Sequence, residues 1–263
     1  MSDKALERIR LKERITEKRD KMLKNDFSAK RATIEEVFDN ATFMVIYKLL
    51  KKGVLDELNG VVNAGKESRV YWGKDPDNKD VAVKIYLTSS AEFKKGMVKY
   101  IQGDYRFKSV KRDTRSLVFT WAQKEFRNLE QAYRAKVNVP KPIVINKNVL
   151  VMQFIGKNGN KAPLLKHVIP EDPEKLYNTI LDSMQRLYQV ADLVHGDLSE
   201  YNIMIWNDKP VMFDMSQSVP STHPLAEFML RRDLENINKF FKRHCVEVCS
   251  VNDAFKKVVE RNT

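Results

Sequence analysis

The stretch His195-Gly196-Asp197-Leu198-Ser199-Glu200-Tyr201-Asn202, followed by Val211-Met212-Phe213-Asp214, decides the fold class of this chain. Asp197 can accept a hydrogen bond from a nucleophile, and Asn202, five residues later, can face the same cavity. Asp214 follows an apolar run that indicates a short strand, so its carboxylate can hold magnesium together with Asn202. This spacing of proton-handling and metal-handling groups is typical of phosphoryl transfer.

A candidate lysine strand precedes this stretch. Val81–Tyr86 alternates around a single lysine, Lys84, as in strands whose ammonium pairs with the α- and β-phosphates of a nucleotide. The alternative is a strand with an exposed lysine on its polar face. Further upstream, Gly60–Gly73 consists of two β-type runs around a turn, which indicates a hairpin that covers phosphates.

The same hairpin segment also fits the start of a Walker A loop. Gly60–Lys66 matches G-x-x-x-x-G-K, but that loop needs Ser or Thr next and a helix after it. Here Glu67 comes next, and Val70–Trp72 is β-branched and aromatic, which favours a strand. We therefore reject a P-loop NTPase.

A helix and a further strand supply the remaining parts of the predicted site. Glu125 lies in a segment with helical periodicity, and we expect it to pair with Lys84. The alternative is a solvated glutamate that pairs with Lys124 or Arg127. Val149–Gly156 is a buried-strand run that ends in glycine, as in a hinge that offers backbone groups to adenine.

Together these segments resemble the RIO-type atypical serine/threonine protein kinases, most closely their first subfamily, over nearly the whole chain. The strings that carry the resemblance are Gly-Lys-Glu-Ser at 65–68, Val-Lys-Ile-Tyr at 83–86, Lys-Glu-Phe-Arg-Asn-Leu at 124–129, Met-Gln-Phe-Ile-Gly at 152–156, Pro-Leu-Leu-Lys at 163–166, Leu-Ser-Glu-Tyr-Asn at 198–202 and Asp-Met-Ser-Gln-Ser-Val at 214–219. The last two strings are the most specific.

The resemblance implies an α+β, two-lobed protein-kinase-like fold. Its N-lobe is β-rich, and its reduced helical C-lobe lacks an activation segment and peptide-docking subdomains. The implied cofactors are ATP and Mg2+, with Mn2+ as a second candidate for the metal. The implied role is in late maturation of the small ribosomal subunit, with the subunit precursor and its rRNA as partners.

The resemblance also implies roles for individual residues. The catalytic residues would be Lys84, Asp197 and Asp214, and the metal ligands Asn202 and Asp214. The implied nucleotide contacts are Gly65, Lys66, Glu67, Ser68, Val70, Ala82, Lys84, Glu125, Met152, Gln153, Ile155, Asn202, Met204 and Asp214. The chain departs from the family at Asn63-Ala64, usually Ser-Thr, and at Gly196, usually Ala; we expect neither change to abolish activity.

The segment after the predicted metal ligand is short. Only 49 residues follow Asp214, and none spells the Ala-Pro-Glu that closes an ordinary activation segment. We therefore expect poor activity toward general peptide substrates. Candidate phosphate acceptors are water, the hydroxyls of Ser109, Thr114 and Ser116, and, by resemblance, Asp214 as a transient acyl phosphate.

The composition indicates an ordinary globular protein. Of 263 residues, 43% are apolar and 31% are charged. No apolar stretch approaches the roughly 20 residues that span a bilayer, and the N-terminus is charged rather than signal-like. We expect a soluble, cytoplasmic monomer that can shuttle to the nucleus and has no membrane partner. Cys245 and Cys249 are expected to be reduced packing residues.

The net charge of +12 is concentrated in two segments. Residues 1–32 hold eleven Lys or Arg against six Asp or Glu, and residues 88–116 hold eight against three. The second segment also contains Phe93, Tyr100, Tyr105 and Phe107. Cations that release counterions and aromatics that stack on bases suit contact with RNA, although solvated surface charge is the alternative.

The predicted organisation has three parts. Residues 1–57 form a basic arm and a helix that opens with a capping box at Thr33–Glu36 and ends near Gly53. Residues 58–155 form the N-lobe, with strands at 58–86 and 142–155 and a flexible basic insertion at 88–116. Residues 156–263 form the C-lobe, with helices over 174–190 and 225–243 and a last helix capped by Ser250. The helix over 225–243 is expected to bury Phe228, Leu234, Ile237, Phe240 and Phe241.

Two other functional classes stay open. Small-molecule phosphotransferases of the aminoglycoside or choline kinase type also use His-Gly-Asp-x-x-x-x-Asn, but they typically follow it with Ile-Asp-Trp or Ile-Asp-Phe-Glu rather than the string at Asp214. The other class is a pre-ribosome binding factor that is switched by nucleotide and has little kinase activity. The protein substrate and the final phosphate acceptor also stay open.

Overall fold

The structure is a computed structural model that describes residues 39–88, 97–107, 113–168 and 170–260. The chain divides into two units, residues 1–56 and 57–263. No helix of the described segments is both long and apolar enough to cross a membrane. The basic arm over 1–32 and the capping box at Thr33–Glu36 lie outside the described residues.

The described part of the first unit contains helix α2, Asn40–Lys51. Asp39 has an extended backbone and caps the helix, because its carboxylate accepts a hydrogen bond from the Thr42 amide at 2.6 Å. The predicted helix therefore begins at Asn40 rather than continuing from residue 33. It ends close to the predicted glycine, Gly53, which has a left-handed φ of 67°.

The second unit contains a five-stranded antiparallel sheet in the order β1-β2-β3-β5-β4. The strands are β1 Glu57–Ala64, β2 Ser68–Lys74, β3 Asp80–Tyr86, β4 Pro142–Asn146 and β5 Val149–Gln153. The central strand β3 is buried at six of its seven positions, as its run of Val, Ala and Ile predicts. The predicted strands of the N-lobe are confirmed.

Helix α4, Thr114–Arg134, follows β3 in sequence and packs against β4. Asp113 caps it by accepting from the Ser116 amide at 2.9 Å. Thr114 and Ser116 therefore lie in the first turn of a helix, not in a loop as predicted. Ser109 lies outside the described residues.

The described part of the insertion, residues 97–107, is also more ordered than predicted. Residues 97–101 are helical, and Tyr100 is 7% exposed and packs at 5.9 Å from the ring of Trp121. The prediction that Tyr100 stacks on RNA bases is therefore wrong, because its ring is used in the core. Tyr105 is exposed, and Phe107 packs against the core edge. Phe93 lies outside the described residues.

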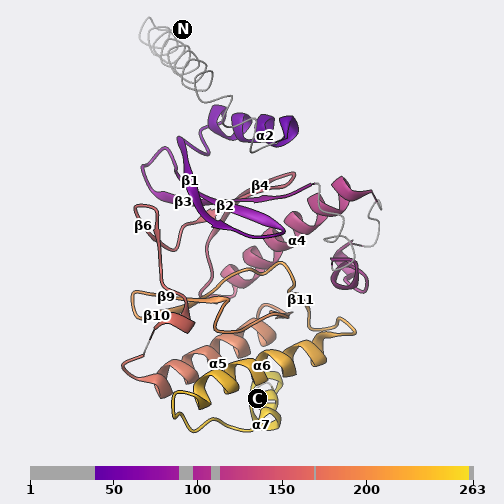
Figure 1. Cartoon of the computed structure of the whole chain (residues 1–263). Helices are drawn as coiled ribbons and strands as arrows, with labels where there is room; N and C mark the ends of the chain where they lie inside the picture. Colours follow the sequence, from indigo (N-terminus) through magenta and orange to yellow (C-terminus); the bar gives the residue numbers. More distant parts are fainter. Residues whose placement is uncertain (1–38, 89–96, 108–112, 169, 261–263) are drawn as a thin grey trace, which may run out of the picture. The chain divides into compact units, whose positions relative to one another are not determined.

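The remaining helices and short strands form the C-lobe. The helices are α5 Pro173–Gln189, α6 Ala226–Lys242 and α7 Val251–Val259, and the 3-10 turn is η2 Leu165–His167. A further 3-10 turn, η1 Tyr105–Phe107, precedes α4 and belongs to the N-lobe. The strands are β6 Gly156–Lys157, β7 Asn160–Lys161, β8 Leu193–Val194, β9 Ile203–Trp206, β10 Lys209–Met212 and β11 Val219–Pro220. The helices α5, α6 and α7 contact one another (Figure 1).

The helical faces of the C-lobe agree with the sequence periodicity except at one residue. Of the residues predicted to be buried in α6, Leu234, Ile237, Phe240 and Phe241 are buried, but Phe228 is 65% exposed. At about 100° per residue, Phe228 lies roughly 160° around the helix from Leu230, opposite the buried stripe. Ser250 caps α7 as predicted, with its hydroxyl accepting from the Asp253 amide at 3.1 Å.

Both cysteines are free. Cys249 is partly buried, with its sulfur 3.1 Å from the hydroxyl of Tyr177. Cys245 is exposed, so the prediction that it is a packing residue is wrong.

Candidate active site

The hairpin β9–β10 explains the twelve-residue spacing between the two predicted metal ligands. Ile203 pairs with Met212 at the open end of the hairpin, so Asn202 and Asp214 leave it side by side. The amide of Phe213 donates to the Asn202 carbonyl at 3.1 Å, which joins the two ends. The hairpin therefore brings the side chains of Asn202 and Asp214 to the same end of its two strands.

Asp197 lies in the catalytic loop, residues 195–202, next to Asn202. The Asn202 side-chain nitrogen donates to the Asp197 carbonyl at 2.7 Å, and the Gln217 amide donates to the Asp197 carboxylate at 3.1 Å. Because the nitrogen of Asn202 is turned to Asp197, its amide oxygen points away and can ligate a cation. Burial raises the pKa of Asp197 above its ordinary value, although nearby Arg232 opposes this.

Asp214 accepts two hydrogen bonds through the same carboxylate oxygen. Lys84 Nζ and Ser216 Oγ each lie 2.9 Å from Asp214 Oδ1. Burial favours the protonated acid, but the Lys84 ammonium outweighs it and lowers the pKa of Asp214 below its ordinary value. The carboxylate is therefore ionised at neutral pH, as a magnesium ligand must be. Its backbone is left-handed, with a φ of 60°.

Lys84 connects two carboxylates at the centre of the site. Its Nζ lies 2.9 Å from both Glu125 and Asp214, and the residue is only 6% exposed. The predicted Lys84–Glu125 pair is present, and the exposed-lysine alternative is wrong. Burial alone would lower the pKa of Lys84, but Asp214 and Glu125 together raise it.

Glu125 is fully buried on α4, so the solvated-glutamate alternative is also wrong. Burial raises the pKa of Glu125 to about 7, opposed by the Lys84 ammonium. The hydroxyl of Tyr86 donates to the second carboxylate oxygen. Glu125 thus uses both oxygens to hold strand β3, in which Lys84 and Tyr86 lie.

A double-mutant cycle tests this pair. We expect Lys84→Ala and Glu125→Ala to be non-additive in ATP turnover, because Glu125 acts by holding the ammonium. The matched control is Glu130→Ala, further along α4, whose carboxylate pairs with exposed Arg134 at 2.8 Å. Its effect should simply multiply with that of Lys84→Ala. Multiplying effects for the Glu125 pair as well would contradict the proposed coupling.

The turn predicted to cover phosphates joins β1 to β2 at residues 65–67. The Gly65 amide donates to the Ser68 carbonyl at 2.9 Å, and the Glu67 carbonyl accepts from the Leu87 amide at 3.0 Å. Strand β2 follows directly, which agrees with the rejection of a P-loop. Partial burial, and then the negative charge of Asp214, raise the pKa of Glu67.

Several of the predicted nucleotide contacts lie on the paired strands β2, β3 and β5. Ala82 pairs with Met152, and Val70 pairs with Lys84, in the register of the sheet. Ile155 is buried in a small apolar cluster that Met204 packs against. The remaining predicted contacts, Gly65, Lys66 and Gln153, are exposed, and Ser68 is partly exposed.

The family of the chain follows from comparison with known proteins. A family model, the RIO domain, matches residues 69–254. The chain belongs to the RIO family. It is 45% identical over 226 residues to the RIO-type serine/threonine-protein kinase Rio1 of Methanocaldococcus jannaschii, with 86% of this chain and 77% of that protein covered. The expected resemblance to the first RIO subfamily is confirmed.

Two further relatives, from Haloferax volcanii and Homo sapiens, are also RIO1-type serine/threonine-protein kinases. Identity is 44% over 209 residues to Rio1 of Haloferax volcanii, covering 80% of this chain and 71% of the relative. Identity is 42% over 236 residues to serine/threonine-protein kinase RIO1 of Homo sapiens, covering 88% of this chain. The chain spans only 41% of the length of the human protein.

A solved RIO kinase shares the fold. The Rio2 kinase–ADP/Mg2+–phosphoaspartate complex from Chaetomium thermophilum has a TM-score of 0.62 and 25% identity, and the match covers 82% of this chain and 66% of that one. The predicted α+β, kinase-like fold is confirmed. The residues of this RIO domain also fit such a ligand, because Asn202 and Asp214 offer oxygen ligands to Mg2+ and Lys84 offers a cation to phosphate.

The RIO domain contains a positioning residue that the sequence did not predict. Asp233 on α6 is fully buried, and its carboxylate accepts from the Gly196 amide at 2.8 Å and the Leu198 amide at 2.9 Å, on either side of Asp197. Burial raises its pKa to about 7, and the two amides oppose this. The sequence signal that could have identified Asp233 is its position on the apolar stripe of α6, next to Leu234.

His195 links the catalytic loop to the backbone before Asp214. Its Nε2 lies 3.1 Å from the Phe213 carbonyl, and the Ser218 hydroxyl donates to the His195 carbonyl at 2.9 Å. Burial lowers the pKa of His195 to about 4, so the ring is neutral and acts structurally. Gly196 is left-handed at 81°, and a Cβ there would lie 3.1 Å from the Gln217 carbonyl, which accounts for the glycine.

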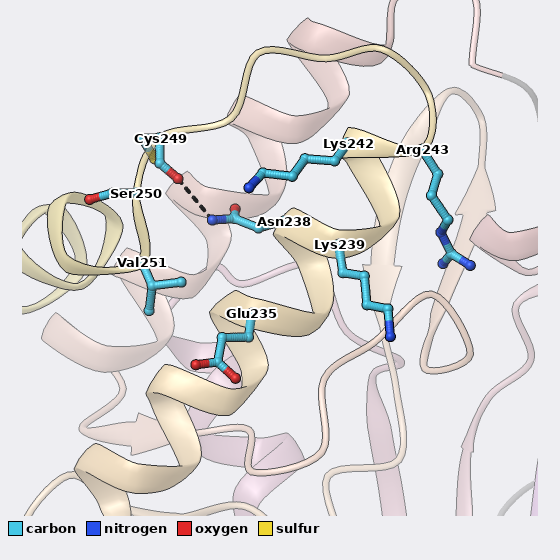
Figure 2. Close-up of a pocket in the computed structure, with 8 residues that line it drawn as sticks. All are labelled: Glu235, Asn238, Lys239, Lys242, Arg243, Cys249, Ser250 and Val251. Atoms are coloured by element: carbon cyan, nitrogen blue, oxygen red, sulfur yellow. Dashed lines mark hydrogen bonds between the residues drawn. The ribbon is translucent and has the colours of Figure 1, made fainter.

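A pocket of about 490 Å3 lies elsewhere in the RIO domain, between α6 and the start of α7 (Figure 2). Its wall includes Lys239, Lys242 and Arg243, and the Asn238 side chain donates to the Cys249 carbonyl at 2.8 Å across one end. None of the predicted nucleotide or metal contacts lines it.

Proposed function

We propose that this RIO domain is an ATP- and Mg2+-dependent serine/threonine kinase or ATPase. The observation that carries the proposal is Lys84, whose ammonium lies 2.9 Å from both Glu125 and Asp214, next to the Asp197–Asn202 loop. The relatives named above are serine/threonine-protein kinases, which supports this class over a small-molecule phosphotransferase. The choice of Mg2+ over Mn2+ is supported by the Rio2 complex, which contains ADP and Mg2+.

Each residue has a distinct task in the proposed reaction. Asn202 and Asp214 hold Mg2+, which would neutralise phosphate charge when bound. Lys84 orients the phosphates, and Glu125 keeps its ammonium in place. Asp197 accepts the proton of the attacking group, and its carboxylate is held for this by Gln217 at 3.1 Å.

The phosphate acceptor is proposed to lie within the chain or to be water. Ser109 is the preferred hydroxyl, because Thr114 and Ser116 belong to the first turn of α4. Asp214 is the second candidate, supported by the phosphoaspartate in the Rio2 complex. Its carboxylate would attack the γ-phosphorus, the bond to the bridging oxygen would break, and ADP would leave.

We propose further that the RIO domain binds the small ribosomal subunit precursor and its rRNA. It would do so as a monomer in the cytoplasm. The support is the excess of positive charge in residues 1–32 and 88–116. Arg106 is not part of this surface. Its guanidinium binds the buried carboxylate of Asp104 through Nε at 2.9 Å and a terminal nitrogen at 2.7 Å, which gives it a structural role.

RNA affinity should fall steeply with salt. Neutralising basic side chains of the insertion should flatten the plot of log affinity against log salt by about 0.7 to 0.9 for each RNA phosphate that the variant no longer neutralises. The variant replaces Lys94, Lys95, Lys108, Lys111 and Arg112 by Gln. The control replaces five exposed lysines elsewhere, Lys161, Lys175, Lys209, Lys239 and Lys256. Equal slopes in the variant, the control and the wild type would show that the insertion is solvated surface.

The proposed function is tested by following ATP turnover with and without small-subunit RNA. Acid and base stability of the labelled protein then separates the acceptors, because acyl phosphates hydrolyse under conditions that leave serine phosphate intact. We expect slow ADP formation, a change in rate with RNA, and label on the protein. Turnover that requires choline or an aminoglycoside would contradict the proposal.

A further inference from the structure

Helix α4 reaches the segment after Asp214 through two buried polar side chains. We call this segment, residues 214–218, the metal loop. Lys124 and Asn128 lie one turn apart on α4 and are both 0% exposed. The glutamate that holds Lys84, Glu125, lies between them in sequence.

Both side chains donate to main-chain carbonyls of the metal loop. Lys124 Nζ donates to the Ser216 carbonyl at 3.1 Å and also to the Ser218 carbonyl. The Asn128 side-chain nitrogen donates to the carbonyl of Met215 at 2.7 Å and to that of Ser218 at 2.9 Å. Three of the four carbonyls after Asp214 are therefore bound by α4.

Packing does not account for this choice of residues. Among the described residues, no carboxylate lies within ion-pair distance of Lys124, and burial, opposed by the charge of Asp104, lowers its pKa to about 7. Its Nζ is held by the carbonyl oxygens of the metal loop instead. Burying an amino group without an ionic partner costs free energy that an apolar side chain of similar volume would not cost. Apart from Glu125, the buried face that Lys124 and Asn128 share with Trp121 and Ala132 is apolar.

The metal loop needs an external support of this kind. Its first residue, Asp214, has a left-handed backbone, which is disfavoured for a residue with a Cβ and persists only when the surroundings hold it. Within the loop, the Ser218 amide donates to the Met215 carbonyl at 3.2 Å. The donors from α4 add four hydrogen bonds to that single turn.

We propose that Lys124 and Asn128 are positioning residues that hold the metal loop so that the Asp214 carboxylate stays in place for Mg2+ and Lys84. Helix α4 then sets both sides of the phosphate site, Lys84 through Glu125 and Asp214 through Lys124 and Asn128. This inference rests on the proposed function for its catalytic consequence, but the contact itself can be tested without nucleotide.

The experiment compares Lys124→Met, which keeps the stem and removes the donor, and Asn128→Leu with a matched control. The control is Gln131→Met on the same helix, whose side chain donates to the Ala191 carbonyl, outside the metal loop. Lys124→Arg restores a cationic donor. If Asn128→Leu does not fold, Asn128→Asp replaces it, because the isosteric acid cannot donate when ionised.

Two readouts are measured on each variant. Without nucleotide, amide hydrogen exchange of the peptide over 213–219 should accelerate about tenfold in Lys124→Met and Asn128→Leu, but not in Gln131→Met. The affinity for a fluorescent ATP analogue in Mg2+ should fall by about 10- to 100-fold, while its affinity in EDTA changes by less than about threefold. Lys124→Arg should recover part of both effects.

The readouts separate the failure of this inference from that of the proposed function. Loop exchange and Mg2+ dependence equal to those of Gln131→Met would overturn the positioning role. A wild-type protein that binds ATP equally well in Mg2+ and EDTA would overturn the proposed function instead. In that case faster loop exchange would still support the contact between α4 and the metal loop.

Discussion

Replacing Asp197 by Ala should lower ATP hydrolysis and hydroxyl-linked autophosphorylation by about 10^2- to 10^4-fold, the range that a positioned general base contributes. The affinity for Mg2+-ATP should stay within about threefold of the wild type, because a base acts mainly in the transition state. The geometry favours this outcome, since the Asp197 carboxylate is held by Gln217 and its carbonyl by Asn202. The measurements are steady-state ADP release and equilibrium nucleotide binding.

A neighbouring substitution controls for damage to the catalytic loop. Ser199→Ala removes a hydroxyl that accepts from the Tyr201 amide at 3.3 Å, two residues from Asp197, and should leave hydrolysis nearly unchanged. Hydrolysis at the wild-type rate in Asp197→Ala would remove Asp197 from the catalytic role. A large loss in Ser199→Ala as well would point to general disruption of the loop.

The second large effect is expected at the metal ligand. Asp214→Asn removes the charge that Mg2+ and Lys84 both face, so the affinity for Mg2+-ATP should fall by about 100-fold. Affinity for ATP in EDTA should change much less, or should rise, because a negative charge near the phosphates is removed. Titration of a fluorescent ATP analogue, with and without Mg2+, measures both values.

The same chemical change at the far end of the hairpin is the control. Asp208→Asn alters an exposed carboxylate in the turn between β9 and β10 and should leave both affinities unchanged. An Asp214→Asn variant that binds Mg2+-ATP as tightly as Asp208→Asn would show that Asp214 is not a metal ligand.

The main parts of the site could be predicted from sequence because each one is marked locally. Lys84 interrupts an apolar strand, and the spacing of Asn202 from Asp214 matches one short hairpin. Glu125 lies 41 residues from Lys84, so no local pattern marks it as the partner of that lysine. The pair could be predicted only because the other parts of the site, and the resemblance to the RIO family, require a carboxylate beside Lys84.

Other residues could not be assigned a role from the sequence because the groups that they contact lie far away along the chain. Lys124 and Asn128 look like surface or neutral helix residues until the carbonyls of the metal loop are brought against α4. Asp233 serves two amides that lie 35 and 37 residues away in sequence. Arg106 lies in the basic segment 88–116 that the sequence predicts to contact RNA, but its guanidinium binds Asp104, a buried carboxylate that no sequence pattern marks.

Magnesium-dependent release of ADP from ATP tests the central claim most directly. The wild-type chain should form ADP in Mg2+, form none above background in EDTA, and lose the magnesium-dependent rate in Lys84→Ala, because Lys84 joins Glu125 to Asp214 at the phosphate site. ADP formation that is unaffected by EDTA, or that is equal in Lys84→Ala and the wild type, would contradict the account.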